Sequence, residues 1–194
     1  MLMGVETEYA IYPPQKVQEF MHKAMEVDEV KRIVNNGGRV YLDGAHPEIS
    51  TPPVTSPFQV WAREREGDRA MAVVSEVCSV KVVKNTCDYF PRSPHFYGSH
   101  ENYEATRPEA VEEAIETLLL PFLITRIIYT GSGILSPVHG YEISARKEAL
   151  FKRNSWISLK NERRYHIIMG ESLISSRAGI LRYGTTALLI HAIE

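Results

Sequence analysis

The sequence predicts a single α+β domain whose mixed sheet presents a polar surface on one face and packs helices on the other. Strand-like and helical segments follow one another along the 194 residues, in the order β-α-β-α-β-β-α-β-β-α. The strand-like segments carry polar groups at every second position, and the helical segments carry apolar stripes. Because alternate residues of a strand project to opposite faces, helices can cover the apolar face and leave the polar face open.

Composition narrows the class of protein. The formal net charge is −2, which argues against nucleic acid or an anionic membrane as the partner. Cys78 and Cys87 are too few for a disulfide framework and lack metal-ligand spacing, so we expect a reduced, cytoplasmic setting. The N-terminus has no signal-peptide pattern, and the longest apolar run, residues 118–128, contains proline, threonine and arginine. We therefore expect no membrane-spanning segment.

Residues 3–11 are predicted to form the first strand, with Glu6 and Glu8 on one face. Two carboxylates at this spacing are unusual in a strand, because like charges repel and glutamate is depleted in strands. A divalent cation between Glu6 and Glu8 would remove the repulsion. A solvent-facing edge strand is the alternative interpretation. The opposite face carries Val5, Thr7 and Tyr9.

Residues 36–51 hold the densest group of functional side chains. An Asn-Gly-Gly turn signal precedes a strand that places Arg39, Tyr41 and Asp43 on one face. We expect Glu6 on the adjacent strand and on the same side of the sheet as Asp43. Gly44 and Ala45 then turn the chain, with His46 and Glu48 just beyond the strand end. The segment indicates a site, and a solvated edge strand with a polar loop is the alternative.

Helical spacing predicts two helices in the first half of the chain. Residues 15–34 carry an apolar stripe. Residues 58–77 form a helix that breaks near Gly67, and the charged run at 63–69 is expected on its solvated face. Residues 79–85 return as a strand. Within residues 96–103, a strand places His100 and Asn102 on one face and Glu101 and Tyr103 on the other. His100 is either structural or a contact to metal or phosphate.

The second half predicts further elements of both kinds. Residues 108–128 read as a buried helix with Thr106 as N-cap and a kink or break at Pro121. Strands are expected at 141–146 and 165–169, and a final apolar helix at 184–193. That helix and the run 118–128 carry enough apolar side chains that they either fold back under the sheet or form an interface with another copy, and we favour association.

Five stretches of sequence resemble the Pup ligase and depupylase family, which are carboxylate–amine ligase relatives of glutamine synthetase. They read M-G-V-E-T-E-Y-A (3–10), N-G-G-R-V-Y-L-D-G-A-H-P-E (36–48), Y-G-S-H-E-N-Y (97–103), L-P-F-L-I-T-R with T-G-S-G (120–133) and R-R-Y-H-I-I-M-G with Y-G-T-T-A-L-L-I (163–190). The resemblance implies a truncated, glutamine-synthetase-like sheet cradle, because it covers only the N-terminal part of the family's catalytic domain. Ser99, the spacing from Asp43 to His46 and G-T-T-A-L are nearer the depupylase branch, whereas a long loop typical of depupylases is missing.

The resemblance also implies roles for individual residues. Asp43 would be the catalytic carboxylate, and Arg39 and Thr51 would contact ATP. Magnesium would be held by Glu6, Tyr41 and Glu48, consistent with its preference for hard oxygen ligands. Independently of the resemblance, the residue pattern predicts Glu8 as a further metal ligand and His100 as a further cofactor-binding residue. The chain departs from the family at Pro53, at Ala145, in residues 154–159 and in residues 171–173.

The function implied is that of an ATP- and magnesium-dependent enzyme. It would make or hydrolyse an isopeptide or amide bond at the C-terminal glutamate or glutamine of a small protein modifier. Its partners would be that modifier and the modified proteins. The alternative is a non-catalytic, truncated paralogue that binds nucleotide or modifier, or one half of a split enzyme completed by a second polypeptide or a homo-oligomer.

Overall fold

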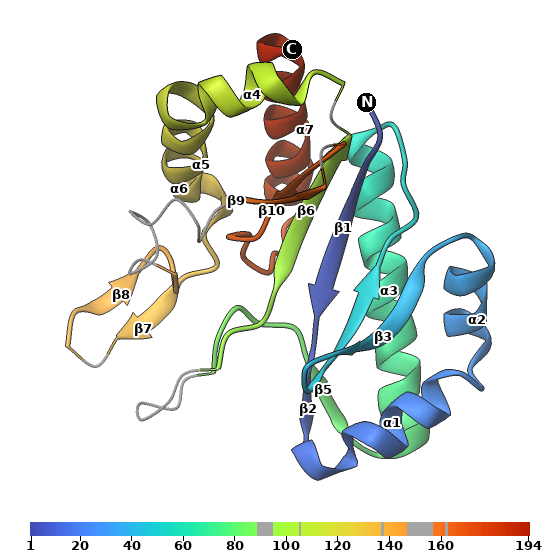
Figure 1. The fold of residues 1–194 in the computed structure, drawn as a ribbon. Helices are drawn as coiled ribbons and strands as arrows, with labels where there is room; N and C mark the ends of the chain where they lie inside the picture. The colour runs from blue at the N-terminus through green and yellow to red at the C-terminus, as the bar shows by residue number, and fades with distance from the viewer. Residues whose placement is uncertain (89–94, 105, 137, 147–156, 162) are drawn as a thin grey trace.

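A six-stranded sheet in the order β3-β4-β1-β6-β10-β9 forms the centre of the protein (Figure 1). The computed structural model describes residues 1–88, 95–104, 106–136, 138–146, 157–161 and 163–194. All pairings in this sheet are antiparallel. The strands are β1 (Met3–Glu8), β3 (Arg39–Asp43), β4 (His46–Ser50), β6 (Ser99–Glu104), β9 (Ile157–Asn161) and β10 (Arg164–Ile167). The predicted α+β class is confirmed.

Helices cover one face of the sheet, with α3 and α7 lying behind it in Figure 1. Two clusters of buried side chains join the layers: one around β1, β6 and β10, the other around β3 and β4. The α-helices are α1 (Val17–Ala24), α2 (Asp28–Asn35), α3 (Pro57–Cys78), α4 (Pro108–Ala114), α5 (Leu120–Thr125), α6 (Ile127–Thr130) and α7 (Ser176–Ile193). Among the described helices, none combines the length and the apolar character needed to cross a bilayer.

The first strand ends earlier than predicted, because the chain changes sheets at Tyr9. After β1, the strand β2 (Ala10–Tyr12) pairs with β5 (Lys81–Val83) in a separate two-stranded sheet. Tyr9 is buried, and its hydroxyl donates to Asp68 in α3. This hydrogen bond holds the chain at the residue where it leaves one sheet and enters the other. The strand predicted at 79–85 is correspondingly reduced to β5.

His46 and Glu48 belong to a strand, which corrects their predicted position beyond the strand end. β3 and β4 form a hairpin in which Asp43 pairs with His46 and Tyr41 pairs with Glu48. Gly44 has φ +58 and closes the short connection, a conformation that glycine adopts without steric cost. The polar segment therefore forms two adjacent strands of the sheet.

Of the two helices predicted in the first half of the chain, the first is divided in the structure and the second is continuous. The segment 15–34 forms a 3₁₀ turn, η1 (Pro14–Lys16), followed by α1 and α2, which are separated at residues 25–27. By contrast, α3 runs unbroken through Gly67. A Cβ there would lie 3.2 Å from Ile49 Cδ1, so glycine lets the helix pack closely on β4. The predicted break at Gly67 is wrong because packing outweighs the low helix propensity of glycine.

The charged run at 63–69 is only partly solvated, which corrects the prediction for α3. Glu64 is 2% exposed. Its carboxylate accepts hydrogen bonds from the Tyr183 hydroxyl in α7 and from Lys84 Nζ. A buried carboxylate needs such partners, so Glu64 ties α3 to α7 and to the segment after β5.

The segment predicted as one helix at 108–128 forms four short pieces. They are α4, a π-helical turn η2 (Ile115–Leu119), α5 and α6, and Pro121 lies in the first turn of α5. Its apolar side is buried as predicted, through Leu119 and Leu123 among others. Thr106 is not the N-cap, which is Arg107.

Downstream, only part of the strand predicted at 141–146 forms, as β8 (Gly140–Glu142) paired with β7 (Ile134–Ser136). The predicted strand at 165–169 appears as β10. Residues 154–156, which belong to a segment that differs from the family pattern, and residues 147–153 lie outside the described residues. The final helix begins at Ser176 rather than at the predicted Gly184. The side chain of Ser175 caps this N-terminus by accepting a hydrogen bond from the Ala178 amide.

A cluster of buried charged side chains packs against β6 on the face of the sheet that the helices cover. Glu101 is completely buried and accepts hydrogen bonds from Arg126 Nη2 at 2.5 Å and from Arg182 Nε at 2.8 Å. Arg182 also donates to the Ser99 side chain and to the Glu171 carbonyl. As predicted, Glu101 lies on the face opposite His100. The cluster therefore anchors the strand that carries His100 to α7 and to the junction between α5 and α6.

Candidate functional site

The open face of the sheet collects the polar side chains of five strands. Directly paired residues share a face, and the register pairs Glu6 with Ser50 and His100, and Glu8 with Glu48. Arg39, Tyr41 and Asp43 share this face, as predicted, and so does Glu6. However, β4 lies between β3 and β1, so the expectation that Glu6 is on the strand adjacent to Asp43 is wrong. The face also carries His46, Asn102, Arg164 and His166.

Glu8, Asp43 and Glu48 form a carboxylate cluster at one end of this face, with one oxygen from each within 4.8 Å of the others. Glu48 is 1% exposed. Its Oε1 accepts a hydrogen bond from the Tyr41 hydroxyl, whereas its Oε2 is buried and has no partner among the described residues. Burial and the neighbouring carboxylates raise the pKa of Glu48 to about 7. An unpaired buried oxygen of this kind requires a proton or a cation.

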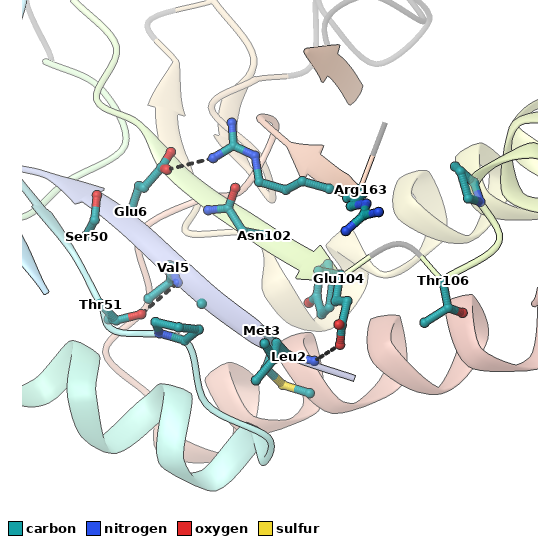
Figure 2. A pocket seen from close by; sticks show the side chains of 15 residues that line it. Leu2, Met3, Val5, Glu6, Ser50, Thr51, Asn102, Glu104, Thr106 and Arg163 are labelled. Carbon is teal, nitrogen blue, oxygen red and sulfur yellow. Dashed lines mark hydrogen bonds and ion pairs between the residues drawn. The ribbon is translucent and has the colours of Figure 1, made fainter. Parts of the chain in front are cut away.

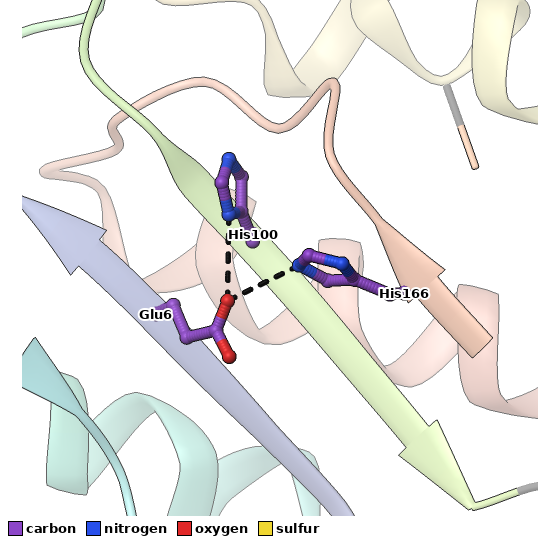
Figure 3. Close-up of side chains that lie close together, drawn as sticks. All are labelled: Glu6, His100 and His166. Carbon is purple, nitrogen blue, oxygen red and sulfur yellow. Dashed lines mark hydrogen bonds and ion pairs between the residues drawn. The ribbon is translucent and has the colours of Figure 1, made fainter. Parts of the chain in front are cut away.

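Glu6, His100 and His166 form a second group, the histidine cluster (Figure 3). Glu6 Oε2 lies 3.4 Å from His100 Nδ1 and 3.1 Å from His166 Nε2. Burial would raise the pKa of Glu6, but hydrogen bonds and charge from the two imidazoles outweigh it and lower the pKa below its usual range. His166 Nδ1 is buried without a described partner. Two imidazoles and a carboxylate are a donor set suited to a divalent metal.

His166 was missed in the sequence, and His100 was expected at the cofactor. The alternation in Tyr165-His166-Ile167 puts His166 on the open face, but only the pairing of His166 with Asn102 reveals its neighbours. Sequence alone gives no such register. The structure brings His100 against Glu6 and His166, which favours a metal-ligand role over direct contact with nucleotide.

The two clusters approach each other at Gly98. A Cβ at this position would lie 2.8 Å from Glu8 Oε1 and 2.7 Å from His100 Nε2. Any larger residue would displace a side chain of one cluster or the other. Glycine at position 98 therefore leaves room for the Glu8 and His100 side chains where they lie.

A cavity of about 760 Å³ opens at the other end of the face, beside Glu6 (Figure 2). Gly4 and Thr51 line it, and the Thr51 hydroxyl accepts a hydrogen bond from the Val5 amide at 3.0 Å. Asn102 Oδ1 is buried here without a described partner. The remaining lining residues include Arg163 and Arg164, of which Arg164 lies 3.6 Å from Glu6. Cations beside an orphaned acceptor suit an anionic ligand with hydrogen-bond donors.

Arg39 and Asp43, the two predicted site residues at the ends of β3, do not line the cavity. The side chain of Arg39 is exposed on edge strand β3, opposite Ser50. Asp43 is also exposed, at the end of β3 beside the turn. Glu171, in the segment 171–173 that differs from the family pattern, is buried, and its carboxylate accepts hydrogen bonds from Ser132 and Ser144.

Comparisons with known proteins identify relatives of this chain. A family model described as Pup-ligase protein matches residues 13–157. The Pup deamidase/depupylase of Mycobacterium tuberculosis (strain ATCC 25618 / H37Rv) is 34% identical, over 98% of this chain and 42% of the relative. The Pup–protein ligase of Bifidobacterium longum subsp. infantis is 31% identical, over 100% of this chain and 47% of the relative.

Solved structures resemble the fold as well. The complex between the prokaryotic ubiquitin-like protein Pup and its ligase PafA matches with a TM-score of 0.77 and 27% identity, over 100% of this chain and 46% of that chain. A structure of PafA in complex with ADP matches with a TM-score of 0.68 and 29% identity, over 81% of this chain and 41% of that chain. The chain thus spans less than half the length of these relatives. Since the family model covers most of the chain, the protein belongs to the Pup-ligase family.

Proposed function

We propose that the open face is the nucleotide- and magnesium-binding part of a Pup ligase or depupylase site. Such a site makes or hydrolyses an isopeptide or amide bond at the C-terminal glutamate or glutamine of Pup. The observation that carries the proposal is the placement of two potential cation-binding clusters and a cavity on one sheet face. The named relatives, which include ligases and depupylases, support the same reading.

The carboxylate cluster suits a hard cation. Glu48 offers a buried oxygen that has no hydrogen-bond partner within the described ranges, and Glu8 lies directly opposite it on β1. Magnesium prefers such oxygen ligands, and Tyr41 would orient Glu48 or add its own oxygen. A second cation would be held by Glu6 with the two histidines. When bound, these cations would neutralise phosphate charge and polarise the phosphoryl group.

The cavity suits the nucleotide, as the ADP complex of the related PafA supports. Arg163 and Arg164 offer planar, bidentate donors for phosphate. Asn102 Oδ1 would accept a hydrogen bond from an amine or hydroxyl of the ligand. Thr51 and Gly4 form part of the wall. With the nucleotide placed here, its phosphates would point along β1 toward Glu6 and Glu8, and Arg39 would reach them from the edge strand.

Asp43 would carry the chemistry, because it lies in the carboxylate cluster and is exposed to an incoming substrate. In the ligase direction a glutamate carboxyl is phosphorylated by ATP, lysine attacks the acyl phosphate, and Asp43 accepts the lysine proton. In the hydrolytic direction Asp43 attacks the carbonyl or positions water against it. Pup and pupylated proteins are the proposed partners. The two buried free cysteines support the proposed cytoplasmic setting.

Because the chain spans less than half the length of the relatives named above, the first test is binding rather than turnover. Calorimetric titration with ATP should show binding in the presence of magnesium and much weaker binding in EDTA. Arg164→Met should weaken binding at least about tenfold, since a charged hydrogen bond contributes about 1.5–3 kcal/mol. The control is Arg177→Met, an exposed arginine on α7. Magnesium-independent binding, or equal affinity of all three proteins, would reject the proposed site.

A further inference from the structure

His46 has contacts that none of the roles proposed above uses. Its Nδ1 lies 2.7 Å from Glu8 Oε2. Its ring is stacked at a tilt on the ring of Tyr97, with 4.5 Å between the centroids. The side chain of His46 is 26% exposed and that of Glu8 is 11% exposed. The pair therefore sits at the rim of the carboxylate cluster, largely shielded from water.

The orientation of the His46 ring is fixed from two sides. On the backbone, His46 pairs with Asp43 across the hairpin. On the ring, Tyr97 is itself held, because its hydroxyl donates to Asp88 at 3.1 Å. Tyr12 donates to the same carboxylate at 3.0 Å. These contacts hold the ring where its Nδ1 faces Glu8.

The contact also fixes the proton on His46. Glu8 as a carboxylate only accepts hydrogen bonds, so Nδ1 must be the donor. The bond engages Oε2 and leaves Oε1 of Glu8 without a hydrogen-bond partner among the described residues. Oε1 is the oxygen that a side chain at position 98 would crowd, at 2.8 Å. Oε2 of Glu8 is thus hydrogen-bonded to His46, whereas the absence of a side chain at Gly98 leaves Oε1 accessible.

We propose that His46 is a positioning residue that holds Glu8 with Oε1 available to the cation of the carboxylate cluster. The inference rests on the proposed function, since it presupposes that this cluster binds a divalent cation. Hydrogen bonds that orient metal ligands from behind contribute about 10- to 100-fold to metal affinity. His46 acts on the carboxylate cluster and leaves the histidine cluster unaffected.

The test compares asparagine and glutamine at position 46. Asparagine places its amide donor where Nδ1 stands, whereas glutamine places it nearer Nε2. Manganese binding is measured by electron paramagnetic resonance in a His166→Ala background, which disables the histidine cluster. We expect His46→Gln and His46→Phe to weaken binding about 10- to 100-fold. His46→Asn should stay within a few-fold of the unchanged residue.

His22→Phe is the matched control, because His22 has a 79% exposed side chain on α1. Circular dichroism establishes that each variant is folded, and the asparagine–glutamine comparison decides the matter if the phenylalanine variant is not. Equal affinity for the glutamine and asparagine variants would overturn the positioning role. Failure of the chain with His46 intact to bind manganese would overturn the proposed function and this inference together.

Discussion

At the scale of the residue, the site is defined by buried oxygens and nitrogens that have no hydrogen-bond partner in the part of the chain that the structure describes. Glu48 Oε2, Asn102 Oδ1 and His166 Nδ1 are of this kind. All three belong to residues of the open face, although a polar atom is usually buried only with a partner. Each therefore indicates a ligand contact more directly than the exposed Arg39 and Asp43 do.

Replacing Glu48 with glutamine should change the pH dependence of stability. The pKa of Glu48 is raised to about 7 in the folded protein, above the value of about 4.3 in an unfolded chain. Ionisation of Glu48 thus destabilises the fold as pH rises from about 4 through 7. In EDTA, Glu48→Gln should be more stable than the unchanged chain by roughly 1–3 kcal/mol at pH 8 and about equal at pH 4.5.

The free energy of unfolding of Glu48→Gln is measured by urea denaturation at both pH values. Glu19→Gln, at an exposed position on α1, serves as the control and should show no such difference. Added magnesium should stabilise the unchanged chain at pH 8 and reduce the advantage of the variant. A variant that is equally stable at both pH values would show that Glu48 is not held in an unfavourable ionised state.

Asp43→Asn tests the chemistry assigned to this residue. The change removes a base or nucleophile and keeps the shape, so ATP affinity should stay within a few-fold while any turnover of a Pup-linked substrate is lost. ATP affinity is measured by calorimetry and turnover by release or formation of the conjugate. Retained turnover would assign the chemistry to another carboxylate of the cluster.

At the scale of the element, the sequence predicts which faces are polar better than it predicts where elements end. Period-two alternation placed Glu6 with Glu8, and His100 with Asn102, on the face where they lie. Alternation carries no information on strand order, so the insertion of β4 between β3 and β1 was not predicted. The continuity of α3 through Gly67 likewise depends on contact with Ile49, which is distant in sequence.

Arg182→Met should test whether the ion cluster beneath β6 supports the fold. Arg182 is 1% exposed and donates to Glu101, Ser99 and Glu171. Its loss leaves a buried carboxylate partly unpaired, which costs about 3–5 kcal/mol. Urea denaturation should show this loss. Arg177→Met on the exposed side of the same helix should change stability by less than about 0.5 kcal/mol; similar losses for both would argue against the cluster.

At the scale of the whole molecule, the final helix packs within the chain but does not hide all its apolar residues. Ile190 is completely buried, and Ala187, Leu189 and Ile193 are partly buried against the core. These residues therefore fold back under the sheet, which is the alternative to the association that we favoured from the sequence. Leu188 and Leu181 remain 68% and 49% exposed, and Ile128 on α6 is 80% exposed. Sequence could not separate these two sides of α7, because both are apolar.

We expect this exposed apolar surface of α6 and α7 to mediate association between copies. Size-exclusion chromatography with light scattering should show a mass above 22.0 kDa at high concentration. Leu188→Glu should shift the protein toward monomer, because a charge in an apolar interface is costly. Val77→Glu, at a 58% exposed position on α3, should leave the mass unchanged. A monomer at every concentration would rule out the association.

The order of strands in the sheet sets different assembly conditions for the two clusters. The carboxylate cluster needs only β1 and the β3–β4 hairpin, which lie within residues 3–50. The histidine cluster joins Glu6 to His166 across most of the chain. During synthesis from the N-terminus, the ligands of the first cation can meet while the chain is short. Those of the second can meet only after β10 has emerged and closed a long loop against β6.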